Sequence, residues 1–307
     1  ETLVEARQRE DVPIAVCLMG GSSVEGPSET LSDVETPTYF DPTRAVRSLA
    51  ALERYREIRE RSYEPPASFD VDRDAARSVL ERVETQGDNR LGIEAMELLD
   101  AYGIETPEGD VVDSPAEAKE LAERIGGDVV MKIVSPDILH KTDIGGVEVG
   151  VPIEEVEDTY EALVARARNY QPDARLLGVQ VQELIDLDDG VETIVGMNRD
   201  PQFGPLVLFG LGGVFVEVLE DTTVRVAPLS EAEAAGMLED IDSTPLLRGA
   251  RGRAPVDEAG IVETIQRLSQ LVTDFPAIVE LDINPLVATA DGVVAVDIRL
   301  TVDPETL

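Results

Sequence analysis

Two of the three lysines of this chain and its only histidine lie in one short segment. Among 307 residues, Lys132, His140 and Lys141 fall within residues 129–146, and the remaining lysine is Lys119. The compact ammonium group of lysine suits phosphate oxygens, and an imidazole titrates near neutral pH. Taken singly, a strand lysine can extend into solvent and a loop histidine can bond to backbone. Because the three occur together, we interpret the segment as a site for nucleotide phosphate chemistry.

The residues around this segment fit the same chemistry. Lys132 lies in a predicted strand, 128–134, whose rigid backbone can hold the ammonium group against the α- and β-phosphates of a nucleotide. Gly145 and Gly146 end the following loop, and their small size would let backbone N–H groups approach phosphate oxygens. We therefore expect Lys132, Lys141, Gly145 and Gly146 to bind the nucleotide.

Polar residues downstream suggest contacts to the rest of a nucleotide. Gln182 and Glu183 end a predicted strand, 175–184, at a position suited to contacts with an adenine edge. Glu192 follows and could accept hydrogen bonds from ribose hydroxyls. Both glutamates are equally well explained as solvated acids at a strand edge, and that alternative stays open.

Carboxylate and amide oxygens near the C-terminus predict a magnesium site. Asp282 and Asn284 are two residues apart, so alternation places them on one side of their strand. Asp297 could meet them from the neighbouring predicted strand, 293–298. Oxygen ligands of this kind suit Mg²⁺ held between protein and phosphates. A turn at the strand ends with Asx hydrogen bonds is the alternative.

Composition and missing motifs argue against several other functions. The chain has no G-x-x-x-x-G-K-[ST] loop and no G-x-G-x-x-G motif. One histidine and one cysteine argue against a zinc site. No run approaches the roughly 18 apolar residues of a membrane helix, and no signal segment opens the chain. Cys17 lies in an apolar run and is predicted to be a small core residue. Without a disulfide partner for it, the cytoplasm is the expected compartment.

The chain is strongly acidic along its whole length. A net charge of −37, from 26 basic and 63 acidic residues, favours solubility and opposes binding to the phosphates of nucleic acid. High acidic content with almost no lysine resembles proteins of salt-loving archaea, in which salt screens the self-repulsion.

The predicted elements indicate two regions joined by a linker. Residues 1–62 have the pattern of the end of an α/β domain, with a buried strand at 12–19 and a helix from about 42 to 61. Residues 63–73 contain Pro65–Pro66 and suit a linker before a second domain, 74–305. So short a first region cannot close a sheet, and the chain starts at Glu1. We therefore expect a fragment that needs upstream sequence or a partner chain.

The second region mixes amphipathic helices with short strands. We predict helices near 74–85, 91–102, 115–125, 154–169, 231–240 and 257–273, and strands near 128–134, 146–151, 175–184, 191–197, 205–209, 278–283 and 293–298. Strands 191–197 and 205–209 flank a turn and predict an antiparallel hairpin. Because all-parallel folds seldom contain one, we expect α+β sheets covered by helices.

Residues 74–302 resemble the ATP-grasp half of the ADP-forming acetyl-CoA and acyl-CoA synthetases, relatives of succinyl-CoA ligase. Residues 1–60 resemble the end of the CoA-ligase half, around residues 35–39 and 44–52. The matching segments of the ATP-grasp half lie in order along the chain, at 130–132, 135–147, 200–205, 210–217, 246–252 and 280–286. The resemblance implies an α/β fold class: an ATP-grasp fold of two subdomains, preceded by the C-terminal piece of a flavodoxin-like domain.

The resemblance also implies a reaction and assigns residues to it. Acyl-CoA, ADP and phosphate interconvert with free acid, CoA and ATP through phosphohistidine. His140 matches a histidine that relays the phosphoryl group near the nucleotide, and Lys132 matches the phosphate lysine. Asn284 and Asp297 match magnesium ligands, and Asp282 is our third candidate ligand. Glu217 and Asp221 lie in a segment expected to position the phosphohistidine.

The chain departs from the family pattern in one respect, which limits the part of the reaction that it can carry out alone. The family uses a first histidine in the CoA-binding half, and His140 is the only histidine here. The chain is therefore expected to need a CoA-binding alpha domain or subunit, and we expect an oligomer. Two alternatives remain: a non-catalytic nucleotide-sensing module of a protein acyltransferase, and another ATP-grasp ligase such as a carboxylate–amine ligase.

Overall fold

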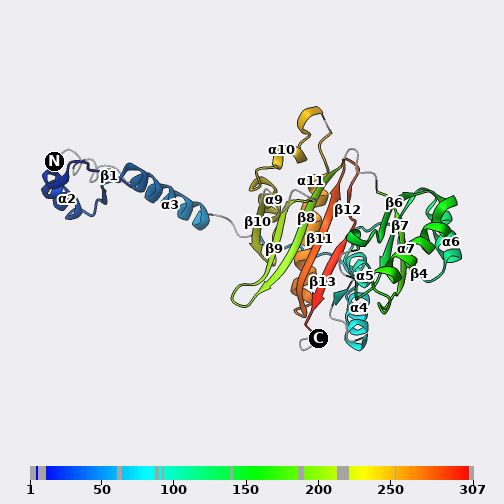
Figure 1. Ribbon diagram of the computed structural model, residues 1–307. Coiled ribbons are helices and arrows are strands. Elements are labelled where there is room, and N and C mark those ends of the chain that lie inside the picture. The colour runs from blue at the N-terminus through cyan, green and yellow to red at the C-terminus, as the bar shows by residue number, and fades with distance from the viewer. Residues whose placement is uncertain are drawn as a thin grey trace. The chain divides into compact units, whose positions relative to one another are not determined.

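The computed structural model describes residue 5 and residues 12–60, 64–86, 90–91, 93–138, 141–185, 190–212, 221–252 and 254–303 (Figure 1). The chain divides into two compact units, Glu1–Tyr63 and Glu64–Leu307, which we describe separately. Within the described residues, no helix has the length and apolar character needed to cross a membrane.

The first unit is a small α/β element. Strand β1 (Val16–Cys17) pairs in parallel with β2 (Thr38–Tyr39), and η1 (Gly21–Val24), α2 (Glu25–Ser32) and α3 (Pro42–Glu60) complete it. Helix α3 starts as the sequence predicts, since the Thr43 N–H donates to Asp41 Oδ1 at 2.8 Å and Pro42 occupies the first turn.

The apolar residues of this unit are less buried than their pattern predicts. The buried strand expected at 12–19 is wrong in extent, because only Val16–Cys17 pairs and Val12 and Met19 are exposed. Val46, Leu52, Tyr55 and Ile58 on α3 are also exposed. The regular spacing of apolar residues therefore predicted helix α3 correctly. It did not predict that the apolar side chains of this helix are exposed.

A seven-stranded antiparallel sheet forms the larger part of the second unit. Its main strand order is β10 (Thr222–Val226), β9 (Gly204–Leu211), β8 (Val191–Asp200), β11 (Ile278–Ala288), β13 (Ile298–Val302) and β3 (Arg90–Leu91), and β12 (Val293–Ala295) pairs with β11. Helices α4 (Arg73–Gln86), α5 (Ile93–Ala101), α9 (Glu231–Glu239) and α11 (Glu258–Asp274) share one hydrophobic core with it. The short elements α10 (Thr244–Leu247) and η5 (Ala250–Gly252) connect α9 to α11.

A four-stranded antiparallel sheet forms the other part. Its order is β4 (Gly109–Val112), β7 (Gly178–Glu183), β5 (Val129–Val134) and β6 (Val147–Val151). Helices α6 (Pro115–Ile125) and α7 (Val156–Tyr170) pack on it through a second hydrophobic core, visible on the right of Figure 1. The single turns η2 (Thr142–Ile144) and η3 (Ile153–Glu155) flank β6.

Capping residues explain where several helices begin and end. Ser114 Oγ accepts a hydrogen bond from the Glu117 N–H at the start of α6, and Pro115 occupies its first position. Gly126 ends the same helix with a φ of 84°, a left-handed conformation that favours glycine. At the start of α9, Ser230 and Glu233 form a capping box.

The six helices predicted for the second region and the hairpin of β8 and β9 are confirmed. The strand predicted at 293–298 is wrong, because it divides into β12 and β13 around Val296 and Asp297. Strands β3, β4 and β10 were not predicted. All three are short. Strands β3 and β4 pair with strands that are distant in the sequence, whereas β10 pairs with β9, the strand before it.

Candidate functional site

Lys132 projects from the face of the four-stranded sheet that lies opposite its helices. Its neighbours Met131 and Ile133 belong to the core beneath α6 and α7, so alternation places Lys132 on the other face. In register, Lys132 lies between Val147 on β6 and Gln180 on β7. Gln180 was missed by the sequence reasoning, although it precedes Gln182 by two residues and shares its face.

Asp282 projects in the same way from the seven-stranded sheet. Leu281 and Ile283 enter the core, so Asp282 lies on the opposite face. Its register partners are Arg299 on β13 and Gly196 on β8. A Cβ atom at position 196 would lie 3.7 Å from Asp282 Oδ1 and 3.2 Å from the Leu281 carbonyl oxygen, so glycine leaves room here. Arg299 was not predicted, although it follows Asp297 by two residues.

Asn284 and Asp297 are joined through their backbones. The Asn284 N–H donates to the Asp297 carbonyl oxygen at 3.1 Å, and the Val296 N–H donates to the Pro285 oxygen at 3.1 Å. Asp297 therefore lies in the break between β12 and β13, beside β11, rather than inside a strand as expected. The break places it next to the predicted ligands.

The ammonium group of Lys141 interacts electrostatically with charged residues from both sheets. Burial lowers its pKa, the Asp297 carboxylate raises it, and the positive charges of Lys132 and Arg299 lower it. Lys132 comes from the four-stranded sheet, whereas Asp297 and Arg299 come from the seven-stranded sheet. Segments more than 150 residues apart in the sequence thus meet around one ammonium group.

Asp282 belongs to the same group of charges. Burial raises its pKa, Arg299 opposes the rise, and Glu280 and Asp297 add to it. We call Lys132, Lys141, Asp282, Asp297 and Arg299 the junction cluster. Three cations beside two carboxylates can bind a polyphosphate together with a divalent cation.

The donor set fits magnesium better than a softer metal. Asp282, Asp297 and Asn284 offer two carboxylates and one amide, and Mg²⁺ is usually bound through one or two carboxylates with phosphates and water completing its shell. Among the described residues, no group of three or more His, Cys, Asp or Glu side chains is placed to hold a metal ion. Such an all-protein cage is not required when phosphate supplies further ligands.

Gly145 and Gly146 differ from our expectation. The Gly145 N–H donates to the Thr142 oxygen at 3.0 Å, and the Gly146 N–H donates to the Lys141 oxygen at 2.7 Å. Gly145 has a φ of 65°, and a Cβ at Gly146 would lie 2.9 Å from the Lys141 oxygen and from Ile133 Cγ2. In this structure both glycines close the turn after Lys141, and their N–H groups are already bonded within it.

The residues proposed for base and ribose lie on central strands. Gln182 is on β7 between Gly109 and Val130, with its side chain buried. Glu183 ends β7, and its N–H donates to the Glu108 oxygen at 2.7 Å. Glu192 is half-buried on β8 opposite Val287.

Asp221 stabilises a turn. Its Oδ1 accepts from the Asp242 N–H at 2.7 Å, and its Oδ2 accepts from the Ser243 N–H at 2.8 Å. Burial raises the pKa of Asp221, but the hydrogen bonds from the backbone amides of Asp242 and Ser243 lower it overall. Asp221 thus acts directly on residues 242–243. The predicted relay residue His140 and its expected positioning residue Glu217 lie outside the described residues.

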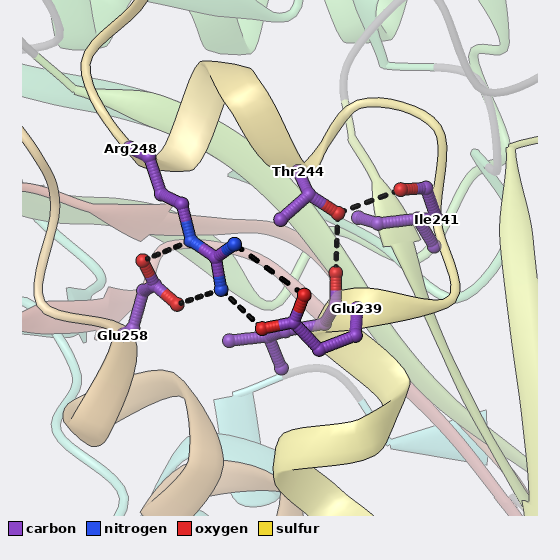
Figure 2. A network of polar contacts seen from close by, with 6 residues as sticks. Glu239, Ile241, Thr244, Arg248 and Glu258 are labelled. Carbon is purple, nitrogen blue, oxygen red and sulfur yellow. Dashed lines mark hydrogen bonds and ion pairs between the residues drawn. The ribbon is translucent and has the colours of Figure 1, made fainter.

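Arg248 ties the segment after α9 to two helices (Figure 2). Its Nε and Nη2 donate to the two oxygens of Glu258 on α11 at 3.1 and 3.2 Å, and its guanidinium also bonds to Glu239 on α9. The Thr244 hydroxyl donates to the Leu238 and Ile241 oxygens at 2.5 and 2.6 Å. A cavity of about 550 Å³ borders the segment and is lined in part by Asp242, Thr244 and Arg248. These contacts stabilise the segment after α9, and Asp221 stabilises the same segment at residues 242–243.

Comparison with known proteins identifies the family of this chain. Residues 82–302 match the family model described as an ATP-grasp domain. The chain is 40% identical over 291 residues to the ADP-forming acetate–CoA ligase I of Archaeoglobus fulgidus, covering 94% of this chain and 42% of that protein. It is 44% identical over 226 residues to the subunit beta of the ADP-forming acetate–CoA ligase I of Pyrococcus furiosus, covering 73% of this chain and 97% of that subunit.

Solved structures give the same result. A chain of the dinucleotide-forming acetyl-coenzyme A synthetase 1 of Candidatus Korarchaeum cryptofilum, in complex with coenzyme A and Ca-AMPCP, matches with a TM-score of 0.72 and 39% identity, over 74% of this chain and 100% of that one. A second structure of that protein, with coenzyme A and Mg-AMPPCP, matches with a TM-score of 0.67 and 37% identity, over 74% of this chain and 100% of that one. Its phosphohistidine segment is described as pointing towards the nucleotide binding site.

The fold is that of an ATP-grasp protein, as the resemblance in the sequence implied. The chain belongs to the ATP-grasp family and, within it, to the ADP-forming acetate–CoA ligases, where it corresponds to the subunit beta. It spans 42% of the length of the longer Archaeoglobus relative.

Proposed function

We propose that this chain is the nucleotide-binding and phosphoryl-relay half of an ADP-forming acid–CoA ligase. The whole enzyme interconverts acyl-CoA, ADP and phosphate with free acid, CoA and ATP. The observation that carries the proposal is the junction cluster, in which Lys132 and Lys141 meet Asp297 and Arg299 from the other sheet. A nucleotide diphosphate placed there has cations for its oxygens and carboxylates for its metal ion.

The chemistry assigned to this chain is a pair of phosphoryl transfers. In the direction of ATP synthesis, His140 accepts the phosphoryl group from a partner phosphohistidine, and one N–P bond forms as another breaks. A β-phosphate oxygen of ADP then attacks phosphorus, the N–P bond breaks, and His140 leaves as neutral imidazole because its other ring nitrogen keeps its proton. Lys132, Lys141 and Arg299 offset the negative charge of the approaching phosphates.

Mg²⁺ would be held by Asp282, Asn284 and Asp297, and when bound it neutralises charge on the nucleotide phosphates. The structure with Mg-AMPPCP supports this assignment by analogy, since that protein is 37% identical to this chain. Asp221 would hold the 242–243 turn, and Glu217 would help to position the phosphohistidine.

The partner is a CoA-binding alpha domain or subunit that carries the first phosphohistidine. The matched relatives support both arrangements, since one is a long single chain and the other a separate subunit beta. The first unit, residues 1–62, would be the C-terminal part of such a CoA-ligase domain, with 63–73 as linker and 74–305 as the ATP-grasp domain.

Labelling from ATP tests the proposed function. The purified chain, incubated with magnesium and ATP labelled on its γ-phosphate, should take up an acid-labile, base-stable label. The variant His140→Asn should lose the label but still bind ADP in calorimetry. Acid-stable label would instead contradict a phosphohistidine relay. Binding of ATP without any label on the wild-type chain would indicate a nucleotide sensor.

We also propose that the protein works in concentrated salt in a cytoplasm. The support is the net charge of −37 with only three lysines. Carboxylates crowded along the chain repel one another, and salt screens that repulsion.

A further inference from the structure

Arg166 on α7 holds the turn that follows Lys141. Its Nη1 donates to the Gly145 carbonyl oxygen at 2.7 Å and to Glu148 Oε1 on β6 at 2.5 Å. A guanidinium that is paired with a carboxylate has a fixed orientation, so its second hydrogen bond is directed at one carbonyl oxygen. One side chain therefore joins the turn to both α7 and β6.

A single peptide unit connects Arg166 to the backbone of Lys141. The Gly145 carbonyl oxygen, which Arg166 contacts, and the Gly146 N–H belong to the same peptide. That Gly146 N–H donates to the Lys141 carbonyl oxygen at 2.7 Å. Because a peptide is planar, the direction of its carbonyl group also sets the direction of its N–H group. Rotation of this peptide would therefore break the contact with Arg166 and the contact with Lys141 together.

Arg166 acts from the side of the four-stranded sheet opposite Lys132. Glu148, which Arg166 contacts, is the register partner of Met131, and Met131 belongs to the core beneath α6 and α7. Residues paired directly across an antiparallel sheet share a face, so Glu148 lies on the helix side. Lys132 follows Met131 and faces the other way. Phosphates bound at Lys132 are thus out of reach of Arg166, which can act on them only through the turn.

We propose that Arg166 is a positioning residue for nucleotide binding, which fixes the Gly145–Gly146 peptide and thereby holds Lys141 at the junction cluster. The charged donor favours one orientation of the Gly145 carbonyl group, and the Gly146 N–H then points at the Lys141 oxygen. Lys141 is thus ordered before the nucleotide arrives, so binding does not have to order it. The inference rests on the proposed function, since it takes the nucleotide phosphates to lie at Lys141.

The test replaces Arg166 with glutamine, which removes the charge and shortens the side chain. Arg166→Gln should weaken binding of ADP with magnesium by roughly fivefold or more in calorimetry. Arg166→Lys keeps a charged donor and should recover part of that loss. Arg267→Gln is the matched control, because Arg267 on α11 also bonds to a carbonyl oxygen and a carboxylate, those of Tyr102 and Glu263. It should lower the melting temperature but bind ADP as wild type does.

A double variant separates positioning of Lys141 from a general loss of stability. If Arg166 acts through Lys141, then Arg166→Gln should change ADP affinity by less than about twofold in a chain that already carries Lys141→Ala, whereas independent effects multiply. Multiplied losses would overturn the inference, as would wild-type affinity of Arg166→Gln or an equal loss of affinity in Arg267→Gln. Failure of the wild-type chain to bind ADP, or an unchanged affinity of Lys141→Ala, would instead contradict the proposed function, and the inference with it.

Discussion

Asp282 on β11 and Arg299 on β13 are direct cross-strand partners on the face of the seven-stranded sheet that lies opposite its hydrophobic core. Arg299 lowers the pKa of Asp282, which burial raises, and it also acts on Lys141. One guanidinium therefore acts electrostatically on both a predicted metal ligand and a predicted phosphate lysine. This arrangement makes Arg299 a direct test of the junction cluster.

Removal of the Arg299 charge should impair nucleotide binding and phosphoryl transfer. Arg299→Gln should weaken ADP binding in the presence of magnesium by about tenfold, or about 1.4 kcal/mol, in calorimetry. Arg299→Lys keeps the charge and should recover most of that loss. Arg44→Gln removes the same charge from the exposed side of α3 and should have no effect. Equal affinities for Arg299→Gln and wild type would remove Arg299 from the site.

The three lysines allow a comparison within one chain. Lys132→Ala should weaken ADP binding by about tenfold or more, because an ammonium group on a rigid strand is lost from the phosphates. Lys119 pairs with Glu157 at 3.0 Å on the surface of α6 and α7, and Lys119→Ala should bind ADP as wild type does. Similar affinities for the two variants would contradict the assignment of Lys132.

Acid should weaken the turn that Asp221 holds. The pKa of Asp221 is lowered in the folded protein, so its contribution is present above the unfolded value of about 3.9 and is lost as pH falls through the folded pKa. Asp221→Asn should therefore lower the melting temperature at pH 7, and its difference from wild type should shrink as pH falls below about 4. Thermal unfolding of both proteins from pH 7 to pH 3 measures this. A difference that does not change with pH would show that the charge of Asp221 is unimportant.

The Thr244 hydroxyl should contribute to the stability of the segment after α9. It donates to two carbonyl oxygens, those of Leu238 and Ile241, and the residue is buried. Thr244→Val should reduce the free energy of unfolding by about 1–2 kcal/mol in urea. Thr273→Val removes a hydroxyl that bonds to the Ser269 oxygen on the exposed side of α11, and it should cost less. Equal losses in the two variants would contradict the importance of the buried network.

Salt should stabilise the folded protein. With a net charge of −37, the melting temperature should rise steadily as potassium chloride is increased from dilute buffer to molar concentrations. Sodium sulfate at equal ionic strength serves as a comparison for screening against ion-specific effects. Equal or greater stability in dilute buffer would contradict adaptation to salt.

Local patterns in the sequence were enough to predict the helices of the second unit. Apolar residues at intervals of three to four, with caps such as Ser114 and Ser230, depend only on neighbours along the chain. The hairpin of β8 and β9 was predicted for the same reason, because its turn lies between two consecutive strands. Strand β4 was not, since its partner β7 is distant in the sequence. Strand β10 was also missed, although it pairs with β9, the strand before it.

The sequence by itself determined that lysines suited to phosphate and oxygen groups suited to a metal ion are present, because residue type limits the chemistry of a side chain. Only the tertiary structure decided which of them meet. The Asp297 carboxylate acts on the charge of Lys141 although the two residues come from distant segments of the chain, and Arg299 acts on both Lys141 and Asp282 because β13 pairs with β11. The amides of Gly145 and Gly146 bond within the local turn after Lys141, and among the described residues the side-chain amide of Gln182 is buried without a partner. Contacts of this kind depend on strand register and packing across the whole fold, which no local spacing of residues specifies.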